Sequence, residues 1–333
     1  MDIAVDTFSG LDSPAVAVLI PCRNEAPTIA KVVNDFADAL PDARIYVYDN
    51  NSTDATAAEA RKAGAIVRHE AQPGKGNVVR RMFADVEADV FVLVDGDDTY
   101  DAGAAPSLIQ RLTTGCYDMI NAARIATCEA AYRPGHRWGN AFLTGVVTCA
   151  FGKRISDLLS GYRVLSRRFV KSFPMLSSGF EVETELTVHA LELRLPIAEV
   201  ALRYRERPQG STSKLRTYHD AARILRLIVR LIKEERPLPF FSFFFLLLAS
   251  AAVIIEIPVL MTYLATAQVP RLPTAILGTG MMLLAFLSLT CGLILDTVTR
   301  GRIELKRLEY LRTPHFAARA DSTPSAADRR KRS

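Results

Sequence analysis

Two long apolar segments near the carboxyl end of the chain limit what it can fold into. Residues 240–266 contain one charged side chain, Glu256, and residues 274–295 contain none. Each exceeds the ~20 residues that a helix needs to cross the hydrocarbon core of a bilayer. The stretch between them holds two prolines and suits a tight turn. The pattern predicts a two-helix transmembrane hairpin, against the alternative of two buried core helices. The predicted hairpin covers residues 237–299, with spans at about 240–266 and 274–297.

The distribution of basic residues predicts the orientation of this hairpin. Its turn contains only Arg271, whereas both flanks are rich in Lys and Arg, which favours a cytoplasmic position for both flanks. Residues 1–14 lack the apolar core of a signal peptide, so we expect the large N-terminal part to lie in the cytosol. The whole chain is then expected to be a multi-pass protein of the cytoplasmic (inner) membrane. The net charge of +5 comes largely from residues beside the membrane, which indicates contact with anionic lipid headgroups and no nucleic acid.

The segment before the hairpin, residues 216–236, has the pattern of an amphipathic membrane-surface helix. Apolar residues alternate with a basic face at helical spacing, which is typical of helices that lie in the membrane interface. An ordinary basic surface helix is the alternative. The members of the basic face are His219, Arg223, Arg226, Arg230 and Lys233.

After the hairpin, residues 300–333 are expected to form a basic, partly disordered cytoplasmic tail.

The N-terminal part of the chain alternates strand and helix signals. Apolar strand-like runs at 15–20, 44–48, 66–68 and 90–94 are separated by stretches with helical spacing at 28–40, 54–63 and 76–86. Such alternation predicts an α/β domain with a mainly parallel sheet covered by helices. Its polar strand ends then meet at one edge, where such sheets bind ligands. The first strand is not followed by Gly-x-Gly-x-x-Gly, and Gly74-Lys75-Gly76 is not a P-loop, so neither nucleotide motif is predicted.

The fourth of these strands ends in three carboxylates, in the sequence VFVLVDGDD at residues 90–98. Unpaired charge is costly beside a buried strand, so a divalent cation explains Asp95 and Asp97 economically. Mg²⁺ in proteins takes one or two carboxylates together with substrate phosphates, which implies a phosphate-bearing substrate. An acidic strand-to-loop turn is the alternative, since Asp and Gly also serve turn chemistry.

Five motifs in order along about residues 16–215 resemble glycosyltransferase family 2, whose domain has the nucleotide-sugar-binding GT-A fold. Within that family the chain is most similar to the polyprenyl-phosphate glycosyltransferases, a group that contains dolichyl-phosphate mannose synthase and bacterial relatives with two transmembrane helices. The motifs are Pro21-x-x-Asn24-Glu25, Asp49-Asn50-Asn51-Ser52-x-Asp54-x-Thr56, Gly74-Lys75-Gly76, Asp95-Gly96-Asp97 and Asp157-x-x-Ser160-Gly161-Tyr162-Arg163. We therefore expect a GT-A domain at 15–215, after an N-terminal extension at 1–14.

The resemblance implies a donor-binding set of residues and a metal. Asp49 would accept an N–H of the nucleotide base, and Asp95 and Asp97 would hold Mg²⁺ or Mn²⁺ on the diphosphate. Some relatives carry Gln where this chain has Thr99, which leaves the third ligand to Asp98 or water. Residues 51–54 can also cap the following helix. The other implied donor contacts are Pro21, Asn24, Glu25, Asn51, Lys75, Gly76, Arg207 and Lys214.

The resemblance also implies an acceptor site. Asp157 would position the acceptor first and take its proton second, and Asp97 and Arg163 complete the implied catalytic set. Arg124, Arg137 and Arg163 would contact a lipid phosphate, because the planar guanidinium binds two oxygens at once. Glu181, Glu183 and Glu185 alternate before a helical run, where they can pair with site cations or interact with the helix dipole.

The expected reaction is the inverting, metal-dependent transfer of a hexose from a nucleotide diphosphate sugar to polyprenyl (undecaprenyl) phosphate at the cytoplasmic membrane face. We expect it to modify cell-envelope glycans. A UDP-sugar is favoured over GDP-mannose as donor, and the resemblance suggests that hairpins pack together into a homo-oligomer. Two other functions remain as alternatives: a processive polysaccharide synthase, which would need more membrane helices, and an inactive nucleotide-sugar-binding scaffold.

Overall fold

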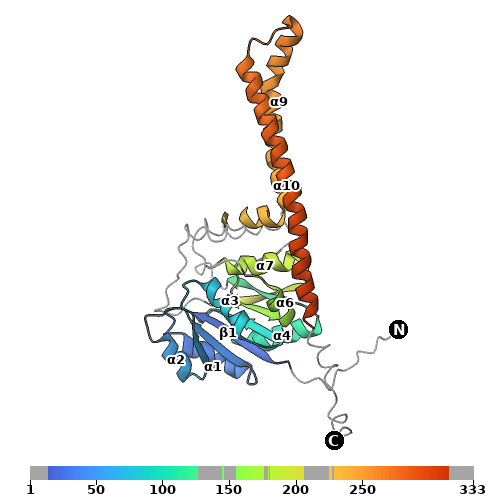
Figure 1. Cartoon of the computed structure of the whole chain (residues 1–333). Helices are drawn as coiled ribbons and strands as arrows, with labels where there is room; N and C mark the ends of the chain where they lie inside the picture. The colour runs from blue at the N-terminus through green and yellow to red at the C-terminus, as the bar shows by residue number, and fades with distance from the viewer. Residues whose placement is uncertain are drawn as a thin grey trace, which may run out of the picture. The chain divides into compact units, whose positions relative to one another are not determined.

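The N-terminal part of the chain folds around one mixed sheet with helices on both faces (Figure 1). The computed structural model describes residues 14–126, 145, 155–175, 179, 181–205, 225–226 and 229–314. The strands are β1 (Val16–Cys22), β2 (Arg44–Asp49), β3 (Ile66–His69), β4 (Val90–Leu93), β5 (Met119–Ala126), β6 (Arg163–Ser166) and β7 (Ile197–Tyr204). The helices of this part are α1 (Ile29–Ala39), α2 (Thr56–Lys62), α3 (Lys75–Asp85), the 3-10 turn η1 (Ala102–Ala104), α4 (Ala105–Thr114), α6 (Arg167–Ser172) and α7 (Val182–Glu192).

The sheet has seven strands in the order β3-β2-β1-β4-β6-β5-β7. The strands β3, β2, β1 and β4 are parallel, β6 runs antiparallel to both β4 and β5, and β7 is parallel to β5. The predicted α/β class with a mainly parallel sheet is confirmed. The alternation of the sequence indicated the first four strands, but it did not reveal β5, β6 or β7.

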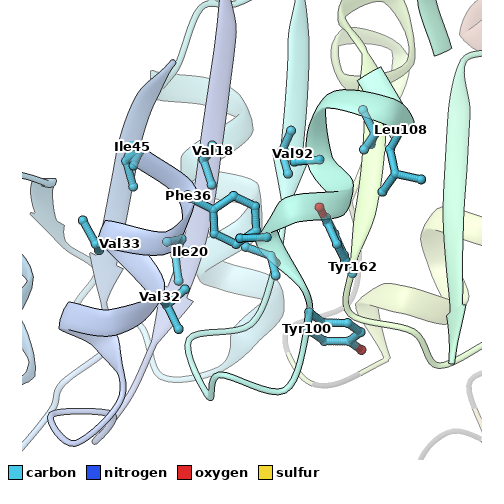
Figure 2. Packing of buried hydrophobic residues seen from close by; sticks show 14 of the residues in the cluster. Val18, Ile20, Val32, Val33, Phe36, Ile45, Val92, Tyr100, Leu108 and Tyr162 are labelled. Carbon is cyan, nitrogen blue, oxygen red and sulfur yellow. The ribbon is translucent and has the colours of Figure 1, made fainter. Parts of the chain in front are cut away.

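The core forms because apolar residues recur at helical spacing on α1 and α4 and face the apolar side of the central strands. Phe36 and Val33 of α1 lie toward Val18 and Ile45, and Leu108 of α4 lies near Val92 (Figure 2). The opposite face is covered by aromatic residues from α3 and the segment after α6. There, the ring of Phe83 meets Phe91 of β4 edge-on, at a centroid distance of 6.3 Å. This two-sided burial fixes the strand ends that carry the polar turns.

The C-terminal part contains two helices that are long and apolar enough to cross a membrane, α9 (Pro237–Thr266) and α10 (Leu272–Arg312). Only 11% of the most apolar window of each is buried, so their outer surfaces are apolar and exposed. Small residues line the seam between the helices, which lets the backbones approach closely. A Cβ at Gly292 would lie 2.8 Å from Cβ of Phe241. The buried members on α10 recur at every seventh residue: Gly278, Ala285, Gly292 and Thr299.

The helix α10 continues past residue 297, the predicted end of its span, and reaches Arg312. Residues 226–305 form one compact unit, while the last residues of α10, from 306 to 312, cluster with the α/β part. Of the predicted membrane-surface helix, the described residues 225–226 and 229–235 are helical, with Arg226 and Arg230 exposed. The predicted boundaries at 215 and 236 stay predictions.

A buried carboxylate joins the end of α10 to the sheet. Asp118, just before β5, is fully buried and accepts bonds from Arg168 Nε (2.5 Å) and Tyr310 Oη (2.7 Å). The guanidinium of Arg168 also lies over the Tyr310 ring, 4.8 Å from its centroid. One turn earlier on α10, Lys306 Nζ lies 2.7 Å from Glu192 Oε2 of α7, and both side chains are largely buried. The last turns of α10 therefore belong to the α/β part.

Replacing Tyr310 by Phe should lower the stability of the full chain. The substitution removes one hydrogen bond to a buried carboxylate, a loss of about 1 kcal/mol in free energy of unfolding. Thermal unfolding in detergent measures the effect. Tyr263→Phe is the matched control, because the Tyr263 side chain in α9 is 49% exposed, and it should leave the midpoint unchanged. Equal midpoints for both variants would contradict a stabilising role for Tyr310.

Candidate functional site

The turns after β1 and β2 are joined side by side at the carboxyl edge of the sheet. Asn24 Oδ1 accepts from the amide of Thr53 at 2.8 Å, and the Asn24 amide donates to Ser52 Oγ at 2.9 Å. The amide of Glu25 donates to Thr56 Oγ1 at 2.8 Å. Asn24 has φ 51°, a left-handed conformation that asparagine tolerates better than most residues. Asn24 therefore builds the site by joining two turns, while Pro21 lies within β1.

Asp49 ends β2 as a buried carboxylate with one unsatisfied oxygen. Its Oδ2 accepts from the amide of Ser52 at 3.4 Å and lies 3.4 Å from Nδ1 of His69. Its Oδ1 is buried and has no hydrogen-bond partner among the residues that the structure describes. Because a buried acceptor without a donor is costly, Asp49 suits a ligand that brings an N–H. Asp54, for its part, accepts from the amide of Thr56 at 3.1 Å at the start of α2, but the N-cap residue of that helix is Ala55, so the predicted capping by Ser52 or Asp54 is not found.

Asn50 shapes the loop that leads to Lys75, a role that the sequence did not suggest. Its amide nitrogen donates to the carbonyls of Glu70 (2.9 Å) and Gln72 (2.7 Å), and its Oδ1 accepts from the amide of Gly74 at 2.8 Å. The neighbouring Asn51 donates to the carbonyl of Ala71 at 2.8 Å. Only its position in the polar run after β2 marks Asn50 in the sequence. The Asn51 amide, expected to contact the nucleotide, is thus used within the protein.

The ammonium of Lys75 lies between two carboxylates from distant parts of the chain. Nζ is 2.5 Å from Asp95 Oδ1, after β4, and 2.5 Å from Glu183 Oε1 in the first turn of α7. Burial alone would lower the pKa of Lys75, but the charges of Asp95 and Glu183 outweigh it and hold that pKa well above its ordinary value. The adjacent Gly76 amide donates to the carbonyl of Gly179 at 3.1 Å. The expected pairing of the alternating glutamates with a site cation is found at Glu183.

The two aspartates of the Asp95-Gly96-Asp97 motif are held differently. Asp97 is buried, and its Oδ1 accepts from the hydroxyl of Thr99 at 2.5 Å. Asp95 lies directly over Gly161, where a Cβ would clash with Asp95 Oδ2. Asp98, weighed as a substitute third metal ligand, pairs with Lys31 of α1 at 2.7 Å. Thr99 therefore orients Asp97, and Asp98 is engaged elsewhere.

The donor atoms of this motif fit a divalent cation that is shared with a phosphate-bearing ligand. Two carboxylates are the usual protein contribution to such a Mg²⁺ site, and the remaining positions go to phosphate oxygens and water. The cradle over Gly161 leaves room for the Asp95 carboxylate, and the ammonium of Lys75 shows that this place stabilises positive charge. In the described part of the chain, no group of three or more His, Cys, Asp and Glu side chains forms a metal site by itself.

Asp157 is locked in a two-pronged ion pair with Arg124 of β5. Arg124 Nε lies 2.7 Å from Oδ2 of Asp157 and Nη2 lies 2.8 Å from Oδ1. Burial alone would raise the pKa of Asp157, but the hydrogen bonds and charge of Arg124 outweigh it and keep that pKa below its ordinary value. The Arg124 guanidinium also lies over the Tyr204 ring, 5.5 Å from its centroid. Both oxygens of Asp157 are occupied, so this carboxylate suits positioning and not proton acceptance.

Arg163 does not lie where a direct phosphate contact requires it. The residue is fully buried, and its guanidinium donates to the carbonyls of Leu158 (3.0 Å) and Ser160 (3.2 Å) and to the hydroxyl of Thr187 (2.8 Å). Arg163 is buried because β6 enters the middle of the sheet at this residue, and the expectation that it holds the acceptor phosphate stays a prediction. Arg137, Arg207 and Lys214 lie outside the described residues.

Comparisons with known proteins point to one family. Residues 17–173 match the family model "Glycosyl transferase family 2". The glycosyltransferase AglJ of Haloferax volcanii is 35% identical over 234 residues, which cover 68% of this chain and 75% of that protein. The dolichyl-phosphate hexose transferase of the same organism is 28% identical over 222 residues, covering 66% and 95%.

A solved structure extends the comparison to the fold. Glucosyl-3-phosphoglycerate synthase from Mycobacterium tuberculosis, in complex with Mn²⁺, uridine-diphosphate-glucose and phosphoglyceric acid, superposes with a TM-score of 0.53 at 25% identity. The match covers 66% of this chain and 79% of that one. The predicted GT-A-like α/β fold is thereby confirmed.

Replacing Gly161 by Ala should displace the Asp95 carboxylate and weaken divalent cation binding. The added Cβ would overlap Asp95 Oδ2, so the Asp95 carboxylate cannot keep its place beside the backbone of Gly161. We expect Mn²⁺ affinity, titrated with UDP present, to fall at least about tenfold. The control is Gly301→Ala in α10, where nothing lies within 4 Å of the added Cβ. Unchanged affinity in a folded Gly161→Ala protein would show that Asp95 is not a ligand.

Proposed function

This chain belongs to glycosyl transferase family 2, and from that premise we propose that it transfers a hexose from a nucleotide diphosphate sugar to polyprenyl phosphate at a membrane surface. The observation that carries the proposal is the gathering of Asp49, Lys75, Asp95 and Asp97 at the carboxyl edge of one sheet, beside the Arg124–Asp157 pair. The first group has the chemistry of a nucleotide diphosphate site. The Arg124–Asp157 pair supplies a fixed cation and a fixed anion next to that site.

The donor in this proposal is a UDP-sugar. The buried Asp49 Oδ1 needs an N–H, and a uracil ring offers one. The solved relative that was captured with Mn²⁺ and uridine-diphosphate-glucose supports the same class of donor. When bound at Asp95 and Asp97, Mg²⁺ or Mn²⁺ stabilises the charge that develops on the leaving diphosphate. Thr99 keeps Asp97 oriented for that task, and Lys75 adds a positive charge beside it.

The acceptor in this proposal is a lipid monophosphate. The relative named dolichyl-phosphate hexose transferase supports it, and so do two helices with the length and composition of membrane spans. The basic residues that flank the two helices support a reaction at the cytoplasmic face of the inner membrane, with the catalytic domain and the C-terminus in the cytosol. Arg137, from outside the described residues, and Arg124 are the arginines proposed to meet the phosphate.

The nucleophile is an oxygen of the acceptor phosphate, which attacks the anomeric carbon with inversion. The second pKa of the acceptor phosphate is about 6, so most of this phosphate is doubly ionised at neutral pH and no strong base is needed. Asp157 remains ionised in its pair with Arg124 and fixes the position of that guanidinium. Developing charge on the leaving diphosphate is met by preorganised cations, of which Lys75 is one.

A donor panel tests the proposed function. The full chain in nanodiscs is given undecaprenyl phosphate, Mn²⁺ and in turn UDP-glucose, UDP-galactose, UDP-N-acetylglucosamine or GDP-mannose, and lipid products are identified by mass. We expect one hexosyl lipid from a UDP-hexose. Asp97→Asn is the control and should lose at least about 100-fold in rate, since a metal ligand is removed. A polymeric product, or sugar release without a lipid product, would refute the proposal.

The pH dependence of transfer separates the roles of acceptor and protein. As pH falls through about 6, the phosphate nucleophile gains a proton, so kcat/KM for the lipid should fall in that window. The pKa of Asp157 lies below its ordinary value, so this carboxylate stays charged there. Asp157→Asn should therefore lower the rate without moving the midpoint. Loss of the acid limb in Asp157→Asn would instead make Asp157 the base.

A further inference from the structure

The buried guanidinium of Arg163 has no carboxylate partner among the described residues. Its hydrogen bonds go to the carbonyls of Leu158 and Ser160, the hydroxyl of Thr187 and, at 3.4 Å, the sulfur of Met119. Burial lowers the pKa of Arg163 to about 10, so the group stays charged at neutral pH. The charges of Glu183 and Asp157 act on Arg163 only from a distance, so burying this guanidinium is costly, and an apolar residue would fill its place at lower cost. The arrangement calls for an explanation beyond stability.

The partners of Arg163 belong to two different halves of the site. Leu158 and Ser160 lie in the loop that carries Asp157, and that carboxylate is the partner of Arg124 on the acceptor side. The planar fork of the guanidinium reaches both carbonyls of this loop at once, which the single ammonium of a lysine cannot do with the same geometry. The conformation of the Asp157 loop therefore depends on Arg163.

A third of these partners, Thr187, lies on α7, which carries the donor-side contact. Its hydroxyl accepts from Arg163 Nη1 at 2.8 Å and donates to the carbonyl of Glu183 at 3.0 Å, one turn earlier. The carboxylate of Glu183 in turn holds Lys75, 2.5 Å away, and Lys75 holds Asp95. A continuous series of hydrogen bonds and ion pairs thus runs from the Asp157 loop through Arg163 to Lys75.

We propose that Arg163 is a positioning residue that couples the donor half of the site to the acceptor half. This inference rests on the proposed function. The coupling means that the Asp157 loop and the first turns of α7 keep their places together. A nucleotide diphosphate that contacts Lys75 is then bound most tightly when the acceptor loop is in place. Weakening Arg163 loosens both halves, although its side chain contacts neither substrate.

Arg163→Lys tests this coupling in the full chain in nanodiscs. The variant keeps the charge and loses the fork, and each lost hydrogen bond corresponds to about a 3- to 10-fold effect. We expect the Kd for UDP without acceptor and the KM for undecaprenyl phosphate to rise together by that amount. Arg167→Lys is the matched control: Arg167 pairs with Glu87 in a partly exposed ion pair and should leave both constants unchanged.

Three results would overturn the coupling. A rise in the lipid KM alone would mean that Arg163 contacts the acceptor phosphate directly. Unchanged constants in a folded Arg163→Lys protein would make the residue purely structural. The third result comes from hydrogen exchange. The coupling predicts faster exchange in the Asp157 loop and in α7 together. A uniform increase in exchange over the whole α/β part would instead indicate general destabilisation.

Thr187→Val provides a second variant if Arg163→Lys does not fold. It removes the link to α7 and leaves the bonds of Arg163 to the Asp157 loop in place. We expect the Kd for UDP to rise by about 3- to 10-fold, with faster exchange in α7. An unchanged Kd and exchange would overturn the coupling. Since nucleotide affinity and exchange need no turnover, they remain readable even if the wild-type chain forms no lipid product, an outcome that refutes only the proposed function.

Discussion

The site depends on one buried cation, the ammonium of Lys75 between Asp95 and Glu183. This interaction joins the start of α3, the end of β4 and the first turn of α7, which are far apart in the sequence. Two carboxylates this close repel each other unless a positive charge lies between them, so the ammonium allows both to be ionised beside a buried strand. A site of this kind is suited to a diphosphate and its metal, because it already balances charges of both signs. The loop shaped by Asn50 places Lys75 there.

The local part of this architecture could be predicted from the sequence, and the non-local part could not. Strand and helix periods before residue 95 indicated β1 to β4, and the polar turns after them indicated the edge where the site lies. The burial of Arg163 could not be predicted because it follows from β6 running antiparallel between β4 and β5, a pairing that no local pattern shows. The same holds for the occupied oxygens of Asp157, whose partner Arg124 lies 33 residues away in the sequence.

The helix α10 takes part in two units of the structure, the helical hairpin and, at its end, the α/β part. The seam of α10 has a small residue at every seventh position, a period that keeps one stripe of a helix against its neighbour. Beyond that seam, α10 continues to a buried cluster around Asp118, where Tyr310 and Arg168 meet. The end of a membrane-type helix is thus an integral part of the α/β fold.

The most direct test of the proposed nucleotide and metal site is a crystal structure of the full chain with Mn²⁺ and UDP, measured with anomalous scattering from the metal. We expect one strong anomalous peak within coordination distance of the carboxylates of Asp95 and Asp97 and of the diphosphate, with the uracil ring at Asp49. A peak that does not touch Asp95 or Asp97, or a nucleotide bound away from this edge of the sheet, would contradict it.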